Sequence, residues 1–230
     1  MNKKVLLLAV SFSVATLFSC NGQKGQKTVS LKNSVDSVSY GIGISIGANM
    51  KKDGLDSLNL EVLKRAMEAA IKGDSLLMTS AESQAVIQEY LGKKQEAKAN
   101  EVGAAGKKFL AENKKKPGVV ELPDGLQYQV ITEGTGPMPT AEDTVVTHYH
   151  GTLIDGTVFD SSVERGEPAE FPVGAVIRGW TEALQMMKVG SKWKLFIPSD
   201  LAYGDRQAGP SILPNSTLIF DVELISIKGK

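Results

Sequence analysis

Residues 144–162 read TVVTHYHGTLIDGTVFDSS and contain two β-prone runs, with an Asp-Gly pair between them. From Val145 onward the first run alternates, so that Val145, Thr147 and Tyr149 share one face and His148 lies on the other. Strict alternation is typical of a strand with one buried face, and an Asp-Gly pair between two such runs is typical of a turn. The segment therefore predicts paired strands with an aromatic side chain facing inward.

Further β-prone runs lie on both sides of this segment, many of them bounded by Gly, Pro or Asp. They are Leu126–Thr132, Ala169–Pro172, Lys192–Ile197 and Thr217–Ile227. Between Gly179 and Val189 the apolar spacing becomes helical and aligns Trp180, Leu184 and Met187. The pattern predicts an α+β fold in which an antiparallel sheet wraps around a single helix.

The composition is that of a globular protein, because 42% of the 230 residues are hydrophobic and 23% are charged. The 26 basic and 26 acidic side chains give no basic excess, which argues against a nucleic-acid binder. The charge is nevertheless uneven: residues 1–116 hold 18 basic and 11 acidic side chains (+7), and residues 117–230 hold 8 and 15 (−7). Two separately composed halves are expected.

The amino terminus has the features of an export signal. Basic Met1–Lys4 precedes an apolar run, Val5–Phe18, which is short for a membrane span. The run ends at Ser19-Cys20 and resembles a bacterial lipobox, which implies a signal peptide over residues 1–19 and lipidation of Cys20. The alternative is a plain signal peptide in which Cys20 has no such role. We expect polar residues 20–33 to form a flexible tether and the protein to act outside the cytoplasm, anchored to the bacterial membrane, at the outer membrane on its periplasmic side or surface.

Residues 34–115 predict a helical domain that ends in one long helix. Apolar spacing predicts helices over about 34–52, 60–72 and 81–113, although residues 41–47 also alternate as a strand would. Residues 92–108 are polar on every side, which predicts a solvated helix spanning two packed bodies and leaves a weak acidic-partner surface as the alternative.

Two short helices make a poor core by themselves. We expect residues 34–115 to dimerise by burying Ile42, Ile46 and Met50 against a second chain. The alternative is that these helices fold back on the carboxyl half of the same chain.

The carboxyl half resembles the FK506-binding-protein (FKBP) class of peptidyl-prolyl cis-trans isomerases from about Glu121 to Ile227. The segments that carry the resemblance are Tyr149–Leu153, Asp155–Ser162, Val176–Trp180, Pro198–Gly204 and Thr217–Leu224. The helical section is similar to the amino-terminal dimerisation domain of macrophage infectivity potentiator and its periplasmic relatives. The resemblance implies an isomerase domain over residues 116–230 and a homodimer.

The resemblance also implies a role for each pocket residue. Trp180 would form the floor of a proline pocket, and Ile177 N–H and the Tyr203 hydroxyl would donate to substrate carbonyls. Asp160 would lie near Tyr149 and Arg165. The implied walls are Tyr149, Phe159, Phe171, Val176, Ile177, Ile212 and Phe220. Aromatic residues on strands are otherwise more often core than site, and Asp160 could merely cap a turn.

Two positions depart from the best-known single-domain members. Ala169 and Ala208 replace an aromatic residue and a histidine that are common there, which puts affinity for FK506-like or rapamycin-like macrolides in doubt. His148 and His150 are interpreted as surface residues, since no third metal ligand is evident. We expect no cofactor and no metal.

Three functions are compatible with these observations. The first is a prolyl isomerase that assists the folding of extracytoplasmic proteins and acts on unfolded or proline-containing polypeptides. The second is a chaperone that holds clients between the helical arms of a dimer. The third is a proline-binding module without useful turnover. The client proteins cannot be named from the sequence.

Overall fold

The computed structural model describes residues 29–229. The predicted signal peptide, Cys20 and the first part of the tether lie outside the described residues. The described chain forms two compact units, divided between Gly73 and Asp74. No helix within 29–229 combines the length and the apolar character needed to cross a membrane.

The first unit consists of two helices, α1 (Ser34–Lys52) and α2 (Leu60–Lys72). The Asn33 side chain caps α1 by accepting from Asp36 N–H, and Asn59 caps α2 in the same way. The helical prediction for residues 41–47 is thus confirmed over the strand alternative. No residue of 29–73 is buried, so this unit has no interior of its own.

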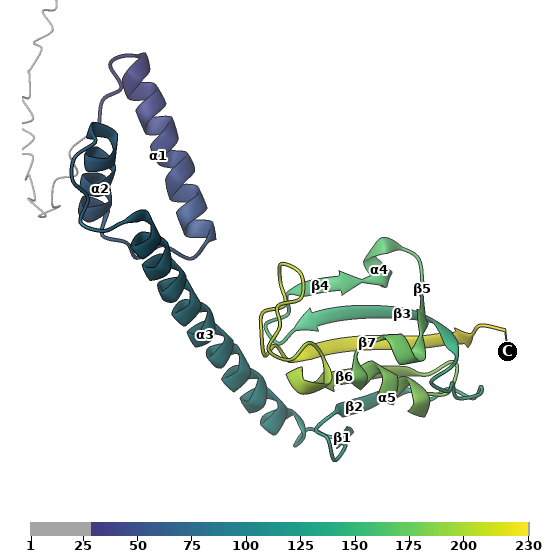
Figure 1. Ribbon diagram of the computed structural model, residues 1–230. Coiled ribbons are helices and arrows are strands. Elements are labelled where there is room, and N and C mark those ends of the chain that lie inside the picture. The colour runs from purple at the N-terminus through teal and green to yellow at the C-terminus, as the bar shows by residue number, and fades with distance from the viewer. Residues whose placement is uncertain (1–28, 230) are drawn as a thin grey trace, which may run out of the picture. The chain divides into compact units, whose positions relative to one another are not determined.

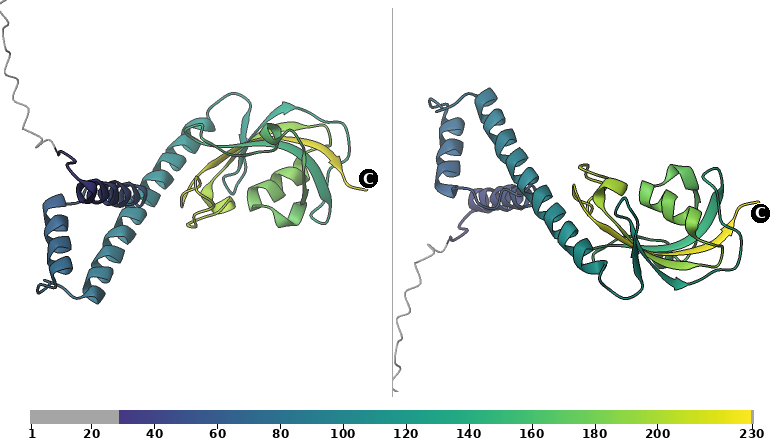
Figure 2. Two further views of the ribbon diagram at one scale, coloured as in Figure 1. Left: turned by 90° about the horizontal axis from the view of Figure 1, so that it is seen from above. Right: turned by 90° about the horizontal axis from the view of Figure 1, so that it is seen from below.

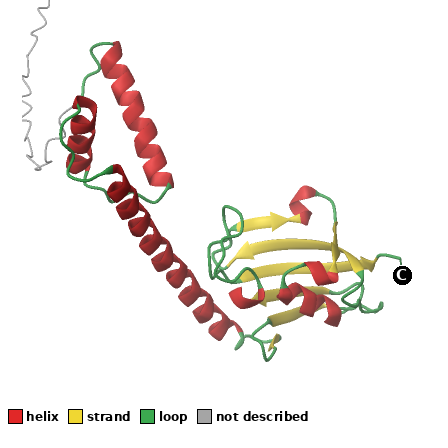
Figure 3. Cartoon of the chain, viewed as in Figure 1, coloured by secondary structure: helices red, strands yellow, loops and turns green. Residues whose placement is uncertain are grey.

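The second unit begins with the long helix α3 (Ser80–Asn113). Thr79 and Glu82 form the capping box that their spacing indicates: the Thr79 hydroxyl accepts from Glu82 N–H, and the Glu82 carboxylate accepts from Thr79 N–H. At 1.5 Å per residue the helix is about 50 Å long. Figure 3 shows it running without a break into the sheet domain.

A seven-stranded antiparallel sheet follows (Figure 1). Its strands are β1 (Val119–Glu121), β2 (Gln127–Thr132), β3 (Thr144–Leu153), β4 (Val158–Ser161), β5 (Ala169–Pro172), β6 (Lys192–Ile197) and β7 (Leu218–Ile227). The order is β1-β2-β6-β7-β3-β4, and β5 pairs with β3. The helical pieces are α4 (Ser162–Arg165), α5 (Arg178–Met186) and two single 3₁₀ turns, Val173–Ala175 and Ser199–Leu201. The predicted α+β class is confirmed.

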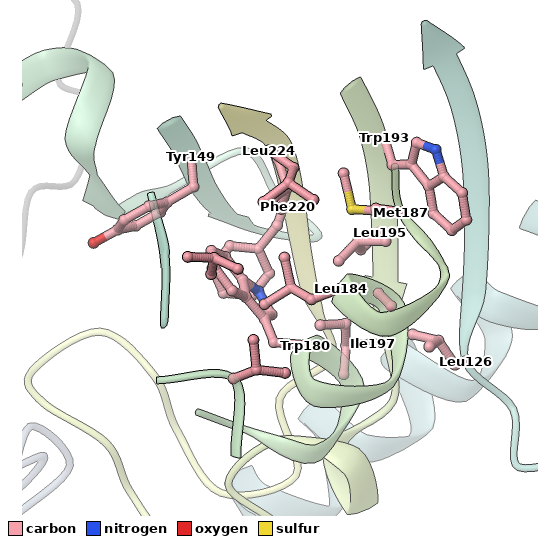
Figure 4. Close-up of a cluster of buried hydrophobic side chains, with 14 of the residues drawn as sticks. Leu126, Tyr149, Trp180, Leu184, Met187, Trp193, Leu195, Ile197, Phe220 and Leu224 are labelled. Atoms are coloured by element: carbon pink, nitrogen blue, oxygen red, sulfur yellow. The ribbon is translucent and has the colours of Figure 1, made fainter. Parts of the chain in front are cut away.

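Helix α5 lies against one face of the sheet (Figure 2). The helical spacing of Trp180 and Leu184 turns both toward the strands, and both are buried, as is Met187 directly after the helix. Gly179 allows the approach, because a Cβ there would lie 2.6 Å from Ile197 Cγ2. The buried side chains pack into one cluster between helix and sheet (Figure 4).

The alternation in β3 is also confirmed. Val145, Thr147 and Tyr149 are buried, whereas His148 and His150 lie on the other face. The outer pair is only half exposed: His148 Nδ1 lies 3.2 Å from Ser162 Oγ, and His150 Nδ1 lies 3.0 Å from Ser161 Oγ. Within residues 29–229 no three His, Cys, Asp or Glu side chains are grouped as a metal site.

The prediction that residues 92–108 are solvated is wrong near the end of that stretch, and the helical turn beyond it also packs on the sheet. Gly106 and Asn113 are buried, and Phe109 packs on Phe196 of β6 with ring centroids 6.0 Å apart. Phe196 and Gln127 are directly paired across β6 and β2, and their neighbours Leu195 and Ile197 face α5. Helix α3 therefore covers the sheet face opposite to α5.

Candidate active site

A hollow of about 970 Å³ opens on the α5 side of the sheet. Residues from β3, β4, β5, α5, β7 and the loop after β6 line it, which is why no short segment of sequence could define it alone. The structure brings ten of the eleven residues singled out from the sequence to its walls: Tyr149, Phe159, Asp160, Phe171, Val176, Ile177, Trp180, Tyr203, Ile212 and Phe220. The eleventh, Arg165, does not line the hollow but donates hydrogen bonds to Asp160 and to the Tyr149 hydroxyl.

Trp180 forms the centre of the aromatic part of the hollow. It is 4% exposed and is the third residue of α5, whose N-cap is Ile177. Three rings meet it nearly edge-on, at centroid distances of 5.2 Å for Phe220, 5.4 Å for Tyr149 and 5.7 Å for Phe171. Edge-to-face packing of this kind fixes ring positions, so the apolar surface is held open and does not collapse.

A hydrogen-bond network holds Tyr149 in place. Its hydroxyl donates to Asp160 Oδ2 at 2.5 Å and accepts from Arg165 Nη2 at 2.8 Å. Arg165 Nη1 also donates to Asp160 Oδ1. Figure 4 shows the Tyr149 oxygen pointing away from the buried cluster. The ring therefore faces the hollow while its polar end is fully bonded.

The network keeps each group in its ordinary charge state near neutral pH. Burial raises the pKa of Tyr149 above its usual 10.0, and the Asp160 carboxylate adds to that effect. Burial also opposes ionisation of Asp160, but hydrogen bonds from Tyr149 and Arg165 outweigh it and hold its pKa below 3.8. A neutral phenol and an anionic carboxylate suit positioning better than proton transfer.

Two donors at the edge of the hollow have no partner among the described residues. They are the Ile177 backbone N–H and the hydroxyl of Tyr203, whose side chain is 37% exposed. Both residues line the hollow. A peptide in the hollow could therefore receive two hydrogen bonds without displacing any bond within the protein.

Sequence reasoning missed the charged rim. Arg178, Asp200, Asp205 and Arg206 also line the hollow, but exposed charged side chains follow no hydrophobic period that would indicate them. Of the two departures from the family pattern, Ala208 lines the hollow, whereas Ala169 lies on β5 and packs against the core cluster.

The chain matches the sequence models of two neighbouring domains. The family described as FKBP-type peptidyl-prolyl cis-trans isomerase matches residues 136–225. A family described as the domain amino terminal to FKBP-type peptidyl-prolyl isomerase matches residues 35–130. Together they cover both described units.

Individual proteins match over most of the chain. The outer membrane protein MIP of Legionella longbeachae is 48% identical over 206 residues, which are 86% of this chain and 88% of that protein. The 22 kDa FKBP-type peptidyl-prolyl cis-trans isomerase of Escherichia coli K12 is 48% identical over 192 residues, 82% of this chain and 93% of that protein.

Solved structures agree. FkpA from Escherichia coli superposes with a TM-score of 0.71 at 38% identity, covering 86% of this chain and 99% of that one. The antiparallel sheet around one helix, with its aromatic hollow, is thus that of a prolyl isomerase domain. The chain belongs to the FKBP-type peptidyl-prolyl cis-trans isomerases. The predicted family, fold class and enzyme activity are confirmed.

Proposed function

We propose that the hollow above Trp180 is where this isomerase turns X-Pro bonds of folding polypeptides. Rotation about a peptide bond faces a barrier of about 18–20 kcal/mol, and X-Pro bonds isomerise slowly enough to limit folding. No covalent bond forms or breaks, so a nucleophile or an acid–base pair is not needed. The observation that carries the proposal is the open, edge-packed aromatic hollow with two unpaired donors at its rim.

The chemistry follows from the polarity of the imide. The planar bond is charge-separated by resonance, and the twisted transition state loses that resonance and is less polar. A water-poor pocket stabilises the twisted form relative to the planar one, which is the differential binding that accelerates a reaction. Donation from Ile177 N–H and the Tyr203 hydroxyl to substrate carbonyls holds the peptide while the prolyl linkage turns.

Two substitutions test the site. Tyr203→Phe removes a rim donor, and Asp160→Ala frees the Tyr149 hydroxyl. Both lower the turnover of a chromogenic X-Pro peptide, while circular dichroism shows the fold retained. Unchanged turnover in both variants refutes the site assignment. Loss of turnover in the presence of an FK506-like inhibitor would place macrolides in the same hollow, with Ala208 at its edge.

We further propose that residues 34–115 dimerise and give the protein a chaperone function. In support, Ile42 is 53% exposed in the single chain, Ile71 is 83% exposed, and no residue of 29–73 is buried. Such a surface is typical of an interface. Residues 116–230 alone are then expected to turn over peptides but to lose the suppression of client aggregation. Equal suppression by that fragment removes the chaperone role from the helices.

The location is proposed as outside the cytoplasm, with Cys20 lipidated. The apolar run before Ser19-Cys20 supports it, as does the relative whose name is outer membrane protein MIP. Mass spectrometry of the protein from membranes tests this proposal. Lipid attached to an amino-terminal Cys20 supports it, and an unmodified chain cleaved elsewhere contradicts it.

A further inference from the structure

The last turns of α3 are fastened to the isomerase domain by two kinds of contact. Asn113 Nδ2 donates to Gln127 Oε1 at 3.0 Å, and Gln127 Nε2 donates to the Leu110 carbonyl at 2.9 Å, with Asn113 and Gln127 both buried. Higher on the helix, Gly106 lies so close to the segment before β7 that a Cβ would clash with Thr217 Oγ1. These two buried hydrogen bonds tie the end of α3 to β2, although Asn113 Oδ1 itself has no partner among the described residues.

Asn215 connects this junction to the edge of the active site. Its side chain donates from Nδ2 to the Ala99 carbonyl of α3 at 3.2 Å. Its backbone N–H donates to the Gly204 carbonyl at 2.8 Å, and Gly204 directly follows Tyr203. Asn215 is the only non-glycine residue of 29–229 with positive φ, at 64°, a conformation that Asn tolerates better than most residues. One residue therefore bonds both to α3 and to the rim of the hollow.

The loop 204–214 lies between two hollows and lines both of them. Ile212 lines the active-site hollow. Its neighbours Ser211 and Leu213 line a second hollow of about 330 Å³, on whose other side lie Val102 and Ala105 of α3. Helix α3 is linked to this loop at Asn215, which bonds to Ala99 and whose Cβ would lie 3.1 Å from a Cβ at Gly103.

We propose that Asn215 is a positioning residue: by bonding to α3 it fixes the loop 204–214, and so holds Tyr203 and Ile212 where a proline peptide binds. The proposal rests on the assignment of these two residues to the substrate site. It makes α3 part of the binding apparatus as well as a link to the first unit. A loosened loop weakens binding of planar and twisted substrate alike, which raises KM more than it changes kcat.

The test uses the full chain and five variants. Asn215→Asp keeps the shape and tolerates the positive φ, but its carboxylate cannot donate to the Ala99 carbonyl. Gly106→Ala introduces a Cβ that clashes with Thr217 Oγ1 and so pushes α3 away from that residue. In the double variant Gly106→Ala, Thr217→Ala this hydroxyl is absent, and the nearest side-chain atom to the new Cβ is the Cβ of residue 217, at 3.2 Å. The single change Thr217→Ala is the reference for that pair. Gly92→Ala, with nothing within 4 Å, is the matched control on the same helix.

KM and kcat for an X-Pro peptide are measured together with hydrogen exchange of the amides in 204–214. Asn215→Asp and Gly106→Ala are expected to raise KM at least about threefold, the value of one net hydrogen bond. In both variants kcat stays within about twofold and the loop amides exchange faster. The Gly106→Ala, Thr217→Ala pair returns KM to that of Thr217→Ala, and Gly92→Ala matches the parent chain. Variants that merely unfold part of the sample lower the apparent kcat and leave KM unchanged.

Unchanged KM and unchanged loop exchange in Asn215→Asp and Gly106→Ala overturn the proposal, as does a KM increase of the same size in Gly92→Ala. The assignment of Tyr203 and Ile212 to the substrate site is tested by a different variant, so its failure can be told apart from failure of the Asn215 proposal. If Tyr203→Phe has full activity, that assignment is wrong, while faster exchange of 204–214 in Asn215→Asp still shows that α3 fixes the loop.

Discussion

Helices α1 and α2 and the sheet domain use apolar residues in opposite ways. In the sheet domain Leu184 is fully buried within one contiguous cluster. In 29–73 the apolar side chains also follow helical spacing, yet Val35, Ile42 and Ile71 are more than half exposed. A regular hydrophobic pattern therefore indicates a buried face without saying which chain buries it. The isomerase domain contains its own core, whereas the helices of 29–73 leave their apolar side chains exposed.

The largest expected effect is on the stability of the isomerase domain, which contains its own core. Leu184→Ala removes a fully buried side chain, and such truncations lower the free energy of unfolding by about 2–5 kcal/mol. Urea unfolding followed by tryptophan fluorescence reports on this domain, because Trp180 and Trp193 both lie in its cluster. Met138→Ala, at a side chain 53% exposed, is the control and changes stability by less than about 0.5 kcal/mol. Equal losses in the two variants would show that the cluster is not the source of stability.

The second prediction concerns the exposed apolar face of α1, where a charge is expected to prevent the proposed dimer from forming. Ile42→Asp places a carboxylate in the proposed dimer interface, where an unpaired charge is costly. The sedimenting mass is expected to fall to that of one chain, while peptide turnover per chain stays within about twofold. Ser37→Asp adds the same charge away from the apolar stripe and leaves the dimer intact. A parent chain that already sediments as a monomer contradicts the dimer.

The smallest effect is the pH dependence of the isomerase site. The pKa of Asp160 is lowered, so its contribution is present above about pH 4 and is lost as the pH falls through the lowered value. The pKa of Tyr149 is raised, so the contribution of its hydroxyl is present below about pH 10 and is lost as the pH rises through the raised value. Turnover should not change with pH between these two limits. In the Asp160→Asn variant the loss of turnover at low pH should be absent. A bell-shaped profile centred near pH 7 would instead indicate a titrating catalyst.

Local signals predicted most of the elements. The bounds of α1, α2, β5 and β6 match the sequence prediction, since caps, glycines and prolines mark their ends. The helix expected over 179–189 ends earlier, at Met186, because Met187 leaves the helical conformation. Strand β1 went unpredicted: three residues are too few to establish a period, and only pairing with β2 defines them.

Contacts between distant segments were less predictable. Gly103 and Gly106 lower helix propensity, so within α3 they indicate weakness more readily than a close approach to Asn215 and Thr217. The pocket residues Phe171 and Ile212 were placed by family resemblance, because an aromatic or aliphatic residue near a strand reads equally well as core. Of the charged rim, Asp205 and Arg206 carried no signal of either kind, whereas Arg178 and Asp200 lie within segments that carry the family resemblance.

The central claim is that a water-poor wall accelerates the turning of the prolyl bond, and Val176 offers the most direct measurement. Val176→Thr keeps the volume of a side chain that lines the hollow and adds one hydroxyl, which brings water with it. If dryness of the wall drives catalysis, kcat/KM for an X-Pro peptide falls at least about fivefold, as expected for a polar group in an apolar site. Full activity in a correctly folded Val176→Thr chain would contradict the account.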